Sequence, residues 1–311
     1  MGDTDGDSRV KEGFVPFAGH RTWYRIAGEG ETAGKLPLLC LHGGPGATWH
    51  HMTPYAGLAE GRRVVCYDQL GCGNSALDEP HDPALWTLEL YLEEIDTIRH
   101  ALGLERCHVL GHSWGGMLAM AYATRRPEGL AGLIVESSPA SVPFWLDEID
   151  RLRSELPIDV EATLRRHESD GTTDSEEYQA TMMVFYDRHV CRIRPWPDWL
   201  QATFDSIAAN PEVYATMNGP SEFHVVGPLR DFDITLELGA IDVPMLLFCG
   251  EFDEVTPATV SRAAQAIPGS QFVVMEGCSH MSQAERPDLT LGLLRGWLAG
   301  VEASRALFSR A

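Results

Sequence analysis

The chain has 311 residues, of which 44% are hydrophobic and 22% are charged, a composition typical of globular proteins that excludes disordered and fibrous classes. It carries 24 Lys and Arg residues against 45 Asp and Glu residues, which gives a formal net charge of −21. So large an excess of negative charge repels phosphate backbones and anionic lipid surfaces. We therefore expect neither a nucleic acid nor a membrane as a partner.

The N-terminus and the cysteines indicate a cytoplasmic protein. Residues 1–12 begin with acidic residues and hold no apolar segment, so we expect a disordered acidic tail rather than a signal or transit peptide. The seven cysteines are odd in number, are scattered along the chain and form no C-x-x-C pair. With no disulfide framework, no metal-ligand spacing and no G-x-G-x-x-G after the first strand, we expect a reducing compartment, no metal and no cofactor.

Short apolar stretches alternate with amphipathic stretches along most of the chain. Several of the apolar stretches are continuous, as in strands that are buried on both faces of a sheet. The pattern predicts an α/β fold with a mostly parallel, doubly wound sheet. Strands are expected at 22–27, 38–42, 64–67, 107–111, 132–136, 245–250 and 271–276, and helices at 88–102, 114–126, 257–267 and 288–298.

The alternation stops between residues 139 and 238. This stretch has helical patterning, many charges and Pro-Trp-Pro at 195–197, but no convincing buried strand. We interpret 139–238 as a helical cap domain, inserted into a core domain made of 13–138 and 239–311. Ligands of open α/β sheets bind beyond the carboxyl ends of the strands, so an insertion there can cover the site.

The most informative motif is Gly-His-Ser-Trp-Gly at 111–115, a G-x-S-x-G between an expected strand and an expected helix. A nucleophile elbow requires that context, because glycines on both sides allow a sharp turn that exposes the Ser113 hydroxyl at the edge of the sheet. The alternative is a chance match in a chain with 30 glycines, which the flanking strand and helix disfavour. We predict that Ser113 is the nucleophile of a serine hydrolase.

A serine hydroxyl needs a base that takes its proton and a carboxylate that orients this base. Asp253 follows the expected strand 245–250, and His280 follows the expected strand 271–276. Both residues therefore lie in loops at the edge of the sheet where Ser113 lies, and the order Ser, Asp, His is that of α/β-hydrolases. We predict a triad of these three residues. The rival orienting acids, which lie in the insertion or before a strand, are Asp231, Asp233 and Asp242.

Acyl transfer also needs donors for the oxyanion that forms on the carbonyl group. The loop His-Gly-Gly-Pro-Gly at 42–46 follows an early strand, where lipases and esterases carry an H-G-G loop. We expect the backbone N–H groups of Gly44 and of Trp114, directly after the nucleophile, to form this oxyanion hole. The alternative for the loop is a plain Gly-Pro turn, and His42 is expected to support the loop rather than to react.

Together these residues resemble the proline iminopeptidase family of α/β-hydrolases, over nearly the whole chain from about Gly13. Leu70 replaces the arginine that is usual in the family. Further stretches, 13–17, 20–25, 185–192 and 221–225, are most similar to the branch that contains L-amino acid amidases, including L-proline amide hydrolase. The resemblance rests on H-G-G-P-G at 42–46, D-Q-L-G-C-G-N-S at 68–75, G-H-S-W-G-G at 111–116 and G-E-F-D-E-V-T-P at 250–257.

The resemblance implies an exo-acting enzyme that recognises a free amine. In related aminopeptidases two glutamates hold the α-amine of the substrate, and the matching positions here are Glu222 and Glu254. An ammonium group that leaves water needs charged partners, which two carboxylates supply. The alternative is that both are ordinary surface glutamates. Aromatic residues of the insertion form either an apolar wall for the substrate or the core of the cap: Phe144, Trp145, Phe185, Tyr186, Trp196, Trp199 and Phe223.

We predict a serine hydrolase that cleaves the amide bond after an N-terminal amino acid with a free amine, through an acyl-enzyme. The expected substrate is a small molecule, either an amino acid amide or a short peptide with a free N-terminus. The leaving group, the side-chain preference and the oligomeric state stay open. Two alternatives remain: an esterase or lactonase that uses the same triad, and a binding protein on a hydrolase fold that has lost catalysis.

Overall fold

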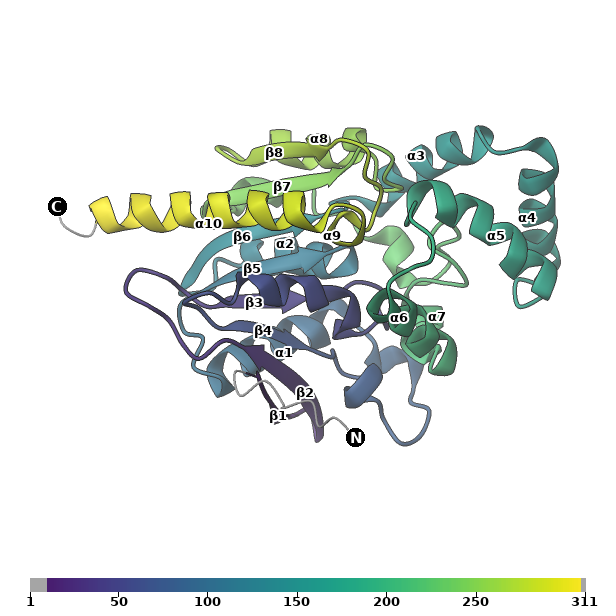
Figure 1. Ribbon diagram of the computed structural model, residues 1–311. Coiled ribbons are helices and arrows are strands. Elements are labelled where there is room, and N and C mark those ends of the chain that lie inside the picture. The colour runs from purple at the N-terminus through teal and green to yellow at the C-terminus, as the bar shows by residue number, and fades with distance from the viewer. Residues whose placement is uncertain (1–9, 309–311) are drawn as a thin grey trace, which may run out of the picture.

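The computed structural model describes residues 10–308, and its centre is an eight-stranded sheet in the order β1-β2-β4-β3-β5-β6-β7-β8 (Figure 1). β2 pairs antiparallel with both β1 and β4, and all other neighbouring strands pair in parallel. The strands are β1 (Val10–Phe17), β2 (His20–Ala27), β3 (Leu38–Leu41), β4 (Val64–Tyr67), β5 (Cys107–His112), β6 (Leu130–Glu136), β7 (Met245–Gly250) and β8 (Gln271–Met275).

The predicted α/β fold with a mostly parallel sheet is confirmed, and the seven expected strands correspond to β2–β8. β1 lies outside the expected strands. It begins at Val10, so the disordered tail predicted for residues 1–12 is wrong for its last three residues, and residues 1–9 lie outside the described residues. The polar start of β1 suits an edge strand, because Glu12 points outward and accepts a hydrogen bond from Arg25 on β2.

Alternate residues of the central strands enter two hydrophobic cores, one on each face of the sheet. Leu38 and Cys40 of β3 pack on one face with residues of η1 and α10. Leu39 and Leu41 pack on the other face with residues of α1, α2 and α8. Because both faces are covered, these strands need no polar side chains. The helices of the core are η1 (Trp49–Leu58), η2 (Gly73–Ser75), η3 (Pro83–Leu85), α1 (Leu88–Ala101), α2 (Trp114–Thr124), α8 (Pro257–Ala266), α9 (Ser282–Glu285) and α10 (Pro287–Phe308).

The four expected helices correspond to α1, α2, α8 and α10, but α10 runs ten residues beyond the expected end at 298. Residues that are distant in the sequence hold this extension in place. Both carboxylate oxygens of Glu302 accept hydrogen bonds from the Arg62 guanidinium, at 2.7 and 2.9 Å, and one of them also accepts the N–H of Leu36 at 3.0 Å. A local pattern does not reveal this pairing, which fixes the last turns of α10 on the core.

The segment between β6 and β7 is helical and lies at one end of the sheet (Figure 1, right). Among the described residues it contains no strand, and its domain boundaries at 139 and 238 stay a prediction. Phe185 packs against Phe223 with ring centroids 4.8 Å apart and is fully buried, so these aromatic side chains form the core of the cap. The helices are α3 (Val142–Ser154), α4 (Ile158–Asp170), α5 (Glu176–His189), α6 (Asp198–Ala209), α7 (Glu212–Met217), η4 (Pro228–Asp231) and η5 (Leu238–Ala240).

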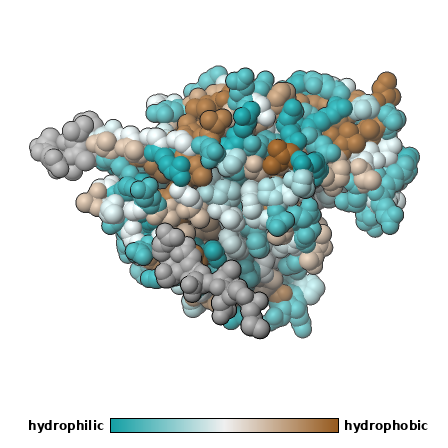
Figure 2. Space-filling model, viewed as in Figure 1, coloured by the Kyte–Doolittle hydropathy of each residue, from teal (hydrophilic) through white to brown (hydrophobic). Residues whose placement is uncertain are grey.

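Figure 2 shows that hydrophilic side chains cover most of one face of the molecule, with hydrophobic side chains in small groups between them. Scattered apolar residues of this kind are normal on protein surfaces. In the described range 10–308, no helix has both the length and the apolar character that crossing a bilayer requires.

Gly115, in the first turn of α2, provides a test of the close packing between this helix and β3. A Cβ atom at Gly115 would lie 2.1 Å from the carbonyl oxygen of Leu41, and the backbone there cannot move aside. We expect Gly115→Ala to lower the free energy of unfolding by about 3 kcal/mol, measured by urea denaturation. Gly300→Ala in α10 is the control, because a Cβ there meets nothing within 4 Å, and it should be neutral or stabilise by about 0.5–1 kcal/mol. Equal losses in both variants would contradict this packing.

Candidate active site

Ser113 occupies the sharp turn between β5 and α2. Its φ of 55° and ψ of −124° lie in a region that residues with a side chain rarely adopt. Hydrogen bonds on both sides hold the turn: the N–H of Ser113 donates to the carbonyl of Glu136 at 3.0 Å, and its carbonyl accepts from Gly116 and Met117 at 2.8 and 3.1 Å. The strained turn leaves the Ser113 side chain half-buried at the carboxyl edge of the sheet, where it lines a pocket.

The structure brings His280 and Asp253 together at the same edge. Nδ1 of His280 donates to Oδ1 of Asp253 at 2.8 Å, and both side chains are almost completely buried. Asp253 is held in turn, because Oδ1 also accepts the N–H of Val255 at 2.8 Å and Oδ2 accepts that of Gly250 at 3.4 Å. Since Nδ1 carries a proton toward the carboxylate, Nε2 is the ring nitrogen that is left for chemistry.

The three rival acids do not take this position. Asp233 accepts hydrogen bonds from Ser141 and Thr235, and Asp242 pairs with Arg126 at 3.6 Å on the surface. Asp231 is exposed at the end of η4. Among the described residues, none of the three forms a hydrogen bond or an ion pair with the His280 ring.

The cap fixes the two loops that carry Asp253 and His280. The carbonyl of His189, at the end of α5, accepts the N–H groups of both Glu254 and His280, at 3.2 and 3.1 Å. The next carbonyl, that of Val190, accepts the N–H of Met281 at 3.0 Å. The end of α5 is therefore part of the framework of the site and not only a cover above it.

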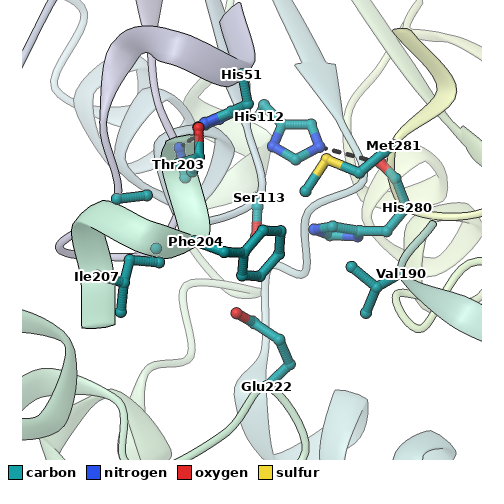
Figure 3. A pocket seen from close by; sticks show the side chains of 13 residues that line it. His51, His112, Ser113, Val190, Thr203, Phe204, Ile207, Glu222, His280 and Met281 are labelled. Carbon is teal, nitrogen blue, oxygen red and sulfur yellow. Dashed lines mark hydrogen bonds between the residues drawn. The ribbon is translucent and has the colours of Figure 1, made fainter. Parts of the chain in front are cut away.

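Core and cap together enclose a small pocket with about 340 Å³ of space not filled by atoms, part of it open to solvent. In Figure 3 the side chains of Ser113, His280 and Glu222 point into this space, and Phe204 of α6 reaches it from the cap. Polar groups of the core and apolar side chains of the cap both face this space. The residues that line the pocket are Gly43, Gly44, Ala47, His51, His112, Ser113, Val190, Thr203, Phe204, Ile207, Glu222, His280 and Met281.

The two predicted oxyanion donors come from different loops, Gly44 from the loop after β3 and Trp114 from the turn after β5. Gly44 lines the pocket, and its φ of 111° requires a glycine. The neighbouring amide of Gly43 is already used, because it donates to Nε2 of His51 at 3.1 Å. Among the described residues, the N–H groups of Gly44 and Trp114 have no hydrogen-bond partner. Both amides are therefore available to a developing negative oxygen.

Glu254 and Glu222 lie close to His280, and neither is a freely exposed surface residue. Glu254 is fully buried, and within the described chain its two carboxyl oxygens have no hydrogen-bond partner. One of these oxygens lies 3.8 Å from Nε2 of His280. Glu222 lines the pocket and accepts a hydrogen bond from the Tyr214 hydroxyl at 2.7 Å, while its N–H donates to the Tyr186 hydroxyl at 3.3 Å.

The three carboxyl groups dominate the electrostatics of the site. Burial alone lowers the pKa of His280, but the negative charges of Asp253 and Glu254 outweigh it and raise the pKa to about 10. Burial raises the pKa of Glu254 well above its usual value and also raises the pKa of Glu222. His280, Glu254 and Glu222 therefore hold protons more strongly than usual, because the empty site contains more negative charge than it can stabilise. A positively charged ligand would relieve this excess.

Two histidines beside the triad position lie outside the sequence-based predictions. His112 donates from Nε2 to the carbonyl of His280 at 3.1 Å, and its ring lies 4.8 Å from the His280 ring. His51 packs against His112 at 5.1 Å. The sequence-based predictions also lack the apolar side chains that line the pocket, which are Val190, Phe204, Ile207 and Met281. The spacing of Phe204 and Ile207 predicts that both side chains lie on one face of a helix. It does not predict what that face contacts, so the sequence alone could not place these residues in the pocket.

Within residues 10–308, no group of three or more His, Cys, Asp or Glu residues is arranged to hold a metal ion. All seven cysteines are buried and carry free thiols.

Comparison with known proteins shows similarity over almost the full length. Residues 37–287 match the model of the alpha/beta hydrolase fold family. The chain is 41% identical over 290 residues to a proline iminopeptidase of Heyndrickxia coagulans, which covers 93% of this chain and 99% of the relative. It is 37% identical over 293 residues to a proline iminopeptidase of Lactobacillus helveticus, with 93% and 98% of the two chains covered.

Solved structures agree with this similarity. The crystal structure of a protein named VinJ superposes with a TM-score of 0.90 at 45% identity, covering 94% of this chain and 99% of the other. The crystal structure of a proline iminopeptidase from Mycobacterium smegmatis superposes with a TM-score of 0.88 at 40% identity, covering 95% of this chain and all of the other.

The charge of Glu254 provides a test of the electrostatics. Only the neutral imidazole of His280 can accept a proton, and it exists above the pKa of this residue. Removal of the negative charge 3.8 Å away lowers that pKa, so Glu254→Gln should shift the rise of activity to lower pH by about one unit or more. The measurement is kcat/KM against pH for p-nitrophenyl acetate, an ester without an amine.

The exposed Glu176 at the start of α5 provides the control variant for this experiment. Glu176→Gln should keep the pH profile of the unmodified protein. A Glu254→Gln profile that also coincides with it would show that this carboxyl group does not act on His280.

Proposed function

The chain belongs to the proline iminopeptidase family of α/β-hydrolases, and on this basis we propose that it hydrolyses the amide bond that follows a single amino acid with a free α-amine. It is a serine hydrolase of the aminopeptidase type. The proposed substrates are amino acid amides, as for the L-amino acid amidases that the sequence resembles, and short peptides with a free N-terminus. The released group is then ammonia or the amine of the remaining peptide.

One observation carries this proposal: a buried carboxyl group that has no hydrogen-bond partner within residues 10–308 lies beside the imidazole of the site. Glu254 is fully buried, and its oxygen lies 3.8 Å from Nε2 of His280. Burial of an unpaired carboxylate is costly unless a cation or a proton compensates it. An α-ammonium group is separated from the scissile carbonyl carbon by a single carbon atom. A ligand with that spacing can reach Glu254 and Glu222 while its carbonyl group reaches Ser113.

The proposed reaction follows acyl transfer to serine. Ser113 Oγ attacks the carbonyl carbon while Nε2 of His280 takes its proton, and Asp253 orients the imidazole and stabilises its positive charge. The N–H groups of Gly44 and Trp114 bind the negative oxygen. His280 then gives the proton to the leaving nitrogen, which departs as an amine or as ammonia. Water attacks the resulting ester of Ser113 with His280 again as base, and the amino acid is released.

The substrate amine also prepares the base. In the empty site the negative field of the carboxyl groups keeps His280 protonated, and a protonated imidazole cannot accept the Ser113 proton. An ammonium group between Glu222 and Glu254 supplies the positive charge instead, so the imidazole releases its proton. Binding of the correct substrate and activation of the base are then one event. The same field disfavours reaction with substrates that lack the amine.

We also propose that the protein acts in the cytoplasm on small molecules. Two features support this proposal: all seven cysteines are buried as free thiols, and the pocket is small. The lining residues from α6, Phe204 and Ile207, favour an apolar first side chain.

A matched pair of substrates tests the recognition of the amine. L-Prolinamide and N-acetyl-L-prolinamide differ in the charge that the glutamates would bind. We expect kcat/KM for the acetylated compound to be lower by about 100-fold or more, because both carboxyl groups are then left without a cation. In Glu222→Gln and Glu254→Gln, KM for L-prolinamide should rise about 10- to 100-fold. Equal turnover of the two compounds would instead support an esterase or lactonase that needs no amine.

Replacement of the nucleophile tests the catalytic role of Ser113. We expect Ser113→Ala to reduce the amidase kcat to less than about 10⁻³ of the original value, with an unchanged melting temperature. A fluorophosphonate probe should label the original protein and leave this variant unlabelled. Lack of labelling in the original protein would favour a binding protein that has lost catalysis.

A further inference from the structure

The motif Asp-Gln-Leu-Gly-Cys-Gly-Asn-Ser at 68–75 contributes no residue to the pocket, yet its Gln69 is fully buried. Gln69 is the second residue after the end of β4. All of its polar groups are paired: the backbone carbonyl accepts the N–H of Cys72 at 3.0 Å, and the other groups bind His42 and Trp114. A fully paired polar side chain in a core usually specifies one arrangement of its partners.

Gln69 holds His42 at two points. Its N–H donates to Nε2 of the His42 ring at 2.9 Å, and its side-chain amide donates to the His42 carbonyl at 2.9 Å. Burial lowers the pKa of His42 to about 4, so the ring is neutral. Because Nε2 accepts, the ring proton lies on Nδ1, which donates to the carbonyl of Gly43 at 2.9 Å.

This bond sets the direction of the Gly44 amide. The carbonyl of Gly43 and the N–H of Gly44 belong to one planar peptide group. An interaction that fixes the plane at the carbonyl therefore also fixes the N–H. On the other side of Gly43, its own N–H donates to Nε2 of His51 at 3.1 Å, so both polar groups of Gly43 are held and only the Gly44 amide is left for the pocket.

The same side chain reaches the second donor. The oxygen of the Gln69 side chain accepts the indole N–H of Trp114 at 2.8 Å. The Trp114 ring is buried and packs edge-on against Tyr91, with centroids 5.8 Å apart, and the Tyr91 hydroxyl donates to the carbonyl of Leu70 at 3.2 Å. Trp114, whose backbone N–H is the second predicted oxyanion donor, is thus anchored through its side chain to the segment with Gln69 and Leu70, and Gln69 also holds His42.

We propose that Gln69 is a positioning residue for the oxyanion hole: its amide ties His42 to Trp114 and so orients the backbone N–H groups of Gly44 and Trp114 together. β3 lies between β4 and β5 in the sheet, so the segment after β4 spans the end of β3 to reach the turn after β5. A glutamine supplies the donor for one side and the acceptor for the other. The inference rests on the acyl-transfer step of the proposed function, and not on recognition of the amine.

The size of the expected effect follows from the value of such donors. Loss of one oxyanion-hole donor typically reduces kcat by about 10²- to 10³-fold. Misalignment weakens a hydrogen bond without removing it, so the cost of losing Gln69 should be smaller. The ground state of the substrate carries little charge on this oxygen, so the loss should fall on kcat rather than on KM.

The test uses Gln69→Met, which keeps the approximate size of the side chain and removes both of its polar groups. We expect kcat to fall about 10- to 100-fold on L-prolinamide and on p-nitrophenyl acetate, with KM within about threefold of the original. Gln265→Met is the matched control, because Gln265 is exposed on α8, and it should leave both constants unchanged. A kcat for Gln69→Met within about twofold of the original on both substrates would overturn the proposal.

A second variant separates positioning from mere stability. Trp114→Phe removes the indole N–H and leaves the backbone N–H in place. We expect a smaller loss of kcat, about threefold to tenfold, because Gln69 still holds His42. In the double variant Gln69→Met with Trp114→Phe, the fold-loss of kcat should be smaller than the product of the two single losses. The reason is that both substitutions remove the same hydrogen bond between Gln69 and the Trp114 indole. Independent, fully multiplicative losses would contradict a shared role.

Inhibitor affinities distinguish a positioning role of Gln69 from a purely structural role. Prolylboronic acid forms a tetrahedral adduct with serine and so uses the oxyanion donors, whereas the product L-proline does not. We expect the Ki of the boronic acid to rise in both variants in proportion to the loss of kcat/KM, and the Ki of L-proline to stay within about twofold. A parallel rise of both Ki values would overturn the proposal.

If Gln69→Met does not fold, the same measurements on Trp114→Phe decide the question. Failure of the proposed function is distinguishable from failure of this inference. If the protein hydrolyses p-nitrophenyl acetate but no amino acid amide, the amine-dependent function is wrong, while the ester kinetics of the two variants still test Gln69.

Discussion

The hydrogen bond of 2.8 Å between Nδ1 of His280 and Oδ1 of Asp253 is the interaction on which the candidate site depends. It joins two loops that follow different strands, and it decides which nitrogen of the imidazole is free. The fold protects it by burying both side chains, by donating the N–H of Val255 to the same carboxylate oxygen and by holding the backbone of His280 on the carbonyl of His189. The pair is therefore preorganised by contacts that involve no substrate.

The cap contributes to this site as a structural partner. One carbonyl at the end of α5 holds the loops of Glu254 and His280 together, and Tyr214 of α7 holds the carboxyl group of Glu222. Gly46, in the loop after β3, lies against the backbone of Tyr214, where a Cβ atom would come within 2.8 Å of the Tyr214 nitrogen. The loop with the proposed oxyanion donor and the helix that supports Glu222, the proposed amine-binding residue, are thus in direct contact. A substitution in either one should affect the other.

The charge of the whole chain and the charge of the site have different consequences. A net charge of −21 describes the surface, where water and ions screen it. Inside the pocket the buried carboxyl groups are not screened, and they change the proton affinity of His280 directly. An ammonium group that binds there replaces a proton. In this proposal the recognition of a free amine and the readiness of the base have one physical origin.

The sequence by itself determined strands β2 to β8, the turn that exposes Ser113 and the chain order of serine, aspartate and histidine, because these depend on local periodicity and on short motifs. Only the tertiary structure decided that Glu254 has no hydrogen-bond partner in the part of the chain that the structure describes, and that Gln69 lies between His42 and Trp114. It also decided the length of α10, through the pairing of Glu302 with Arg62. Each of these depends on contacts between residues from separate strands and helices, and local patterns carry no record of which distant groups meet.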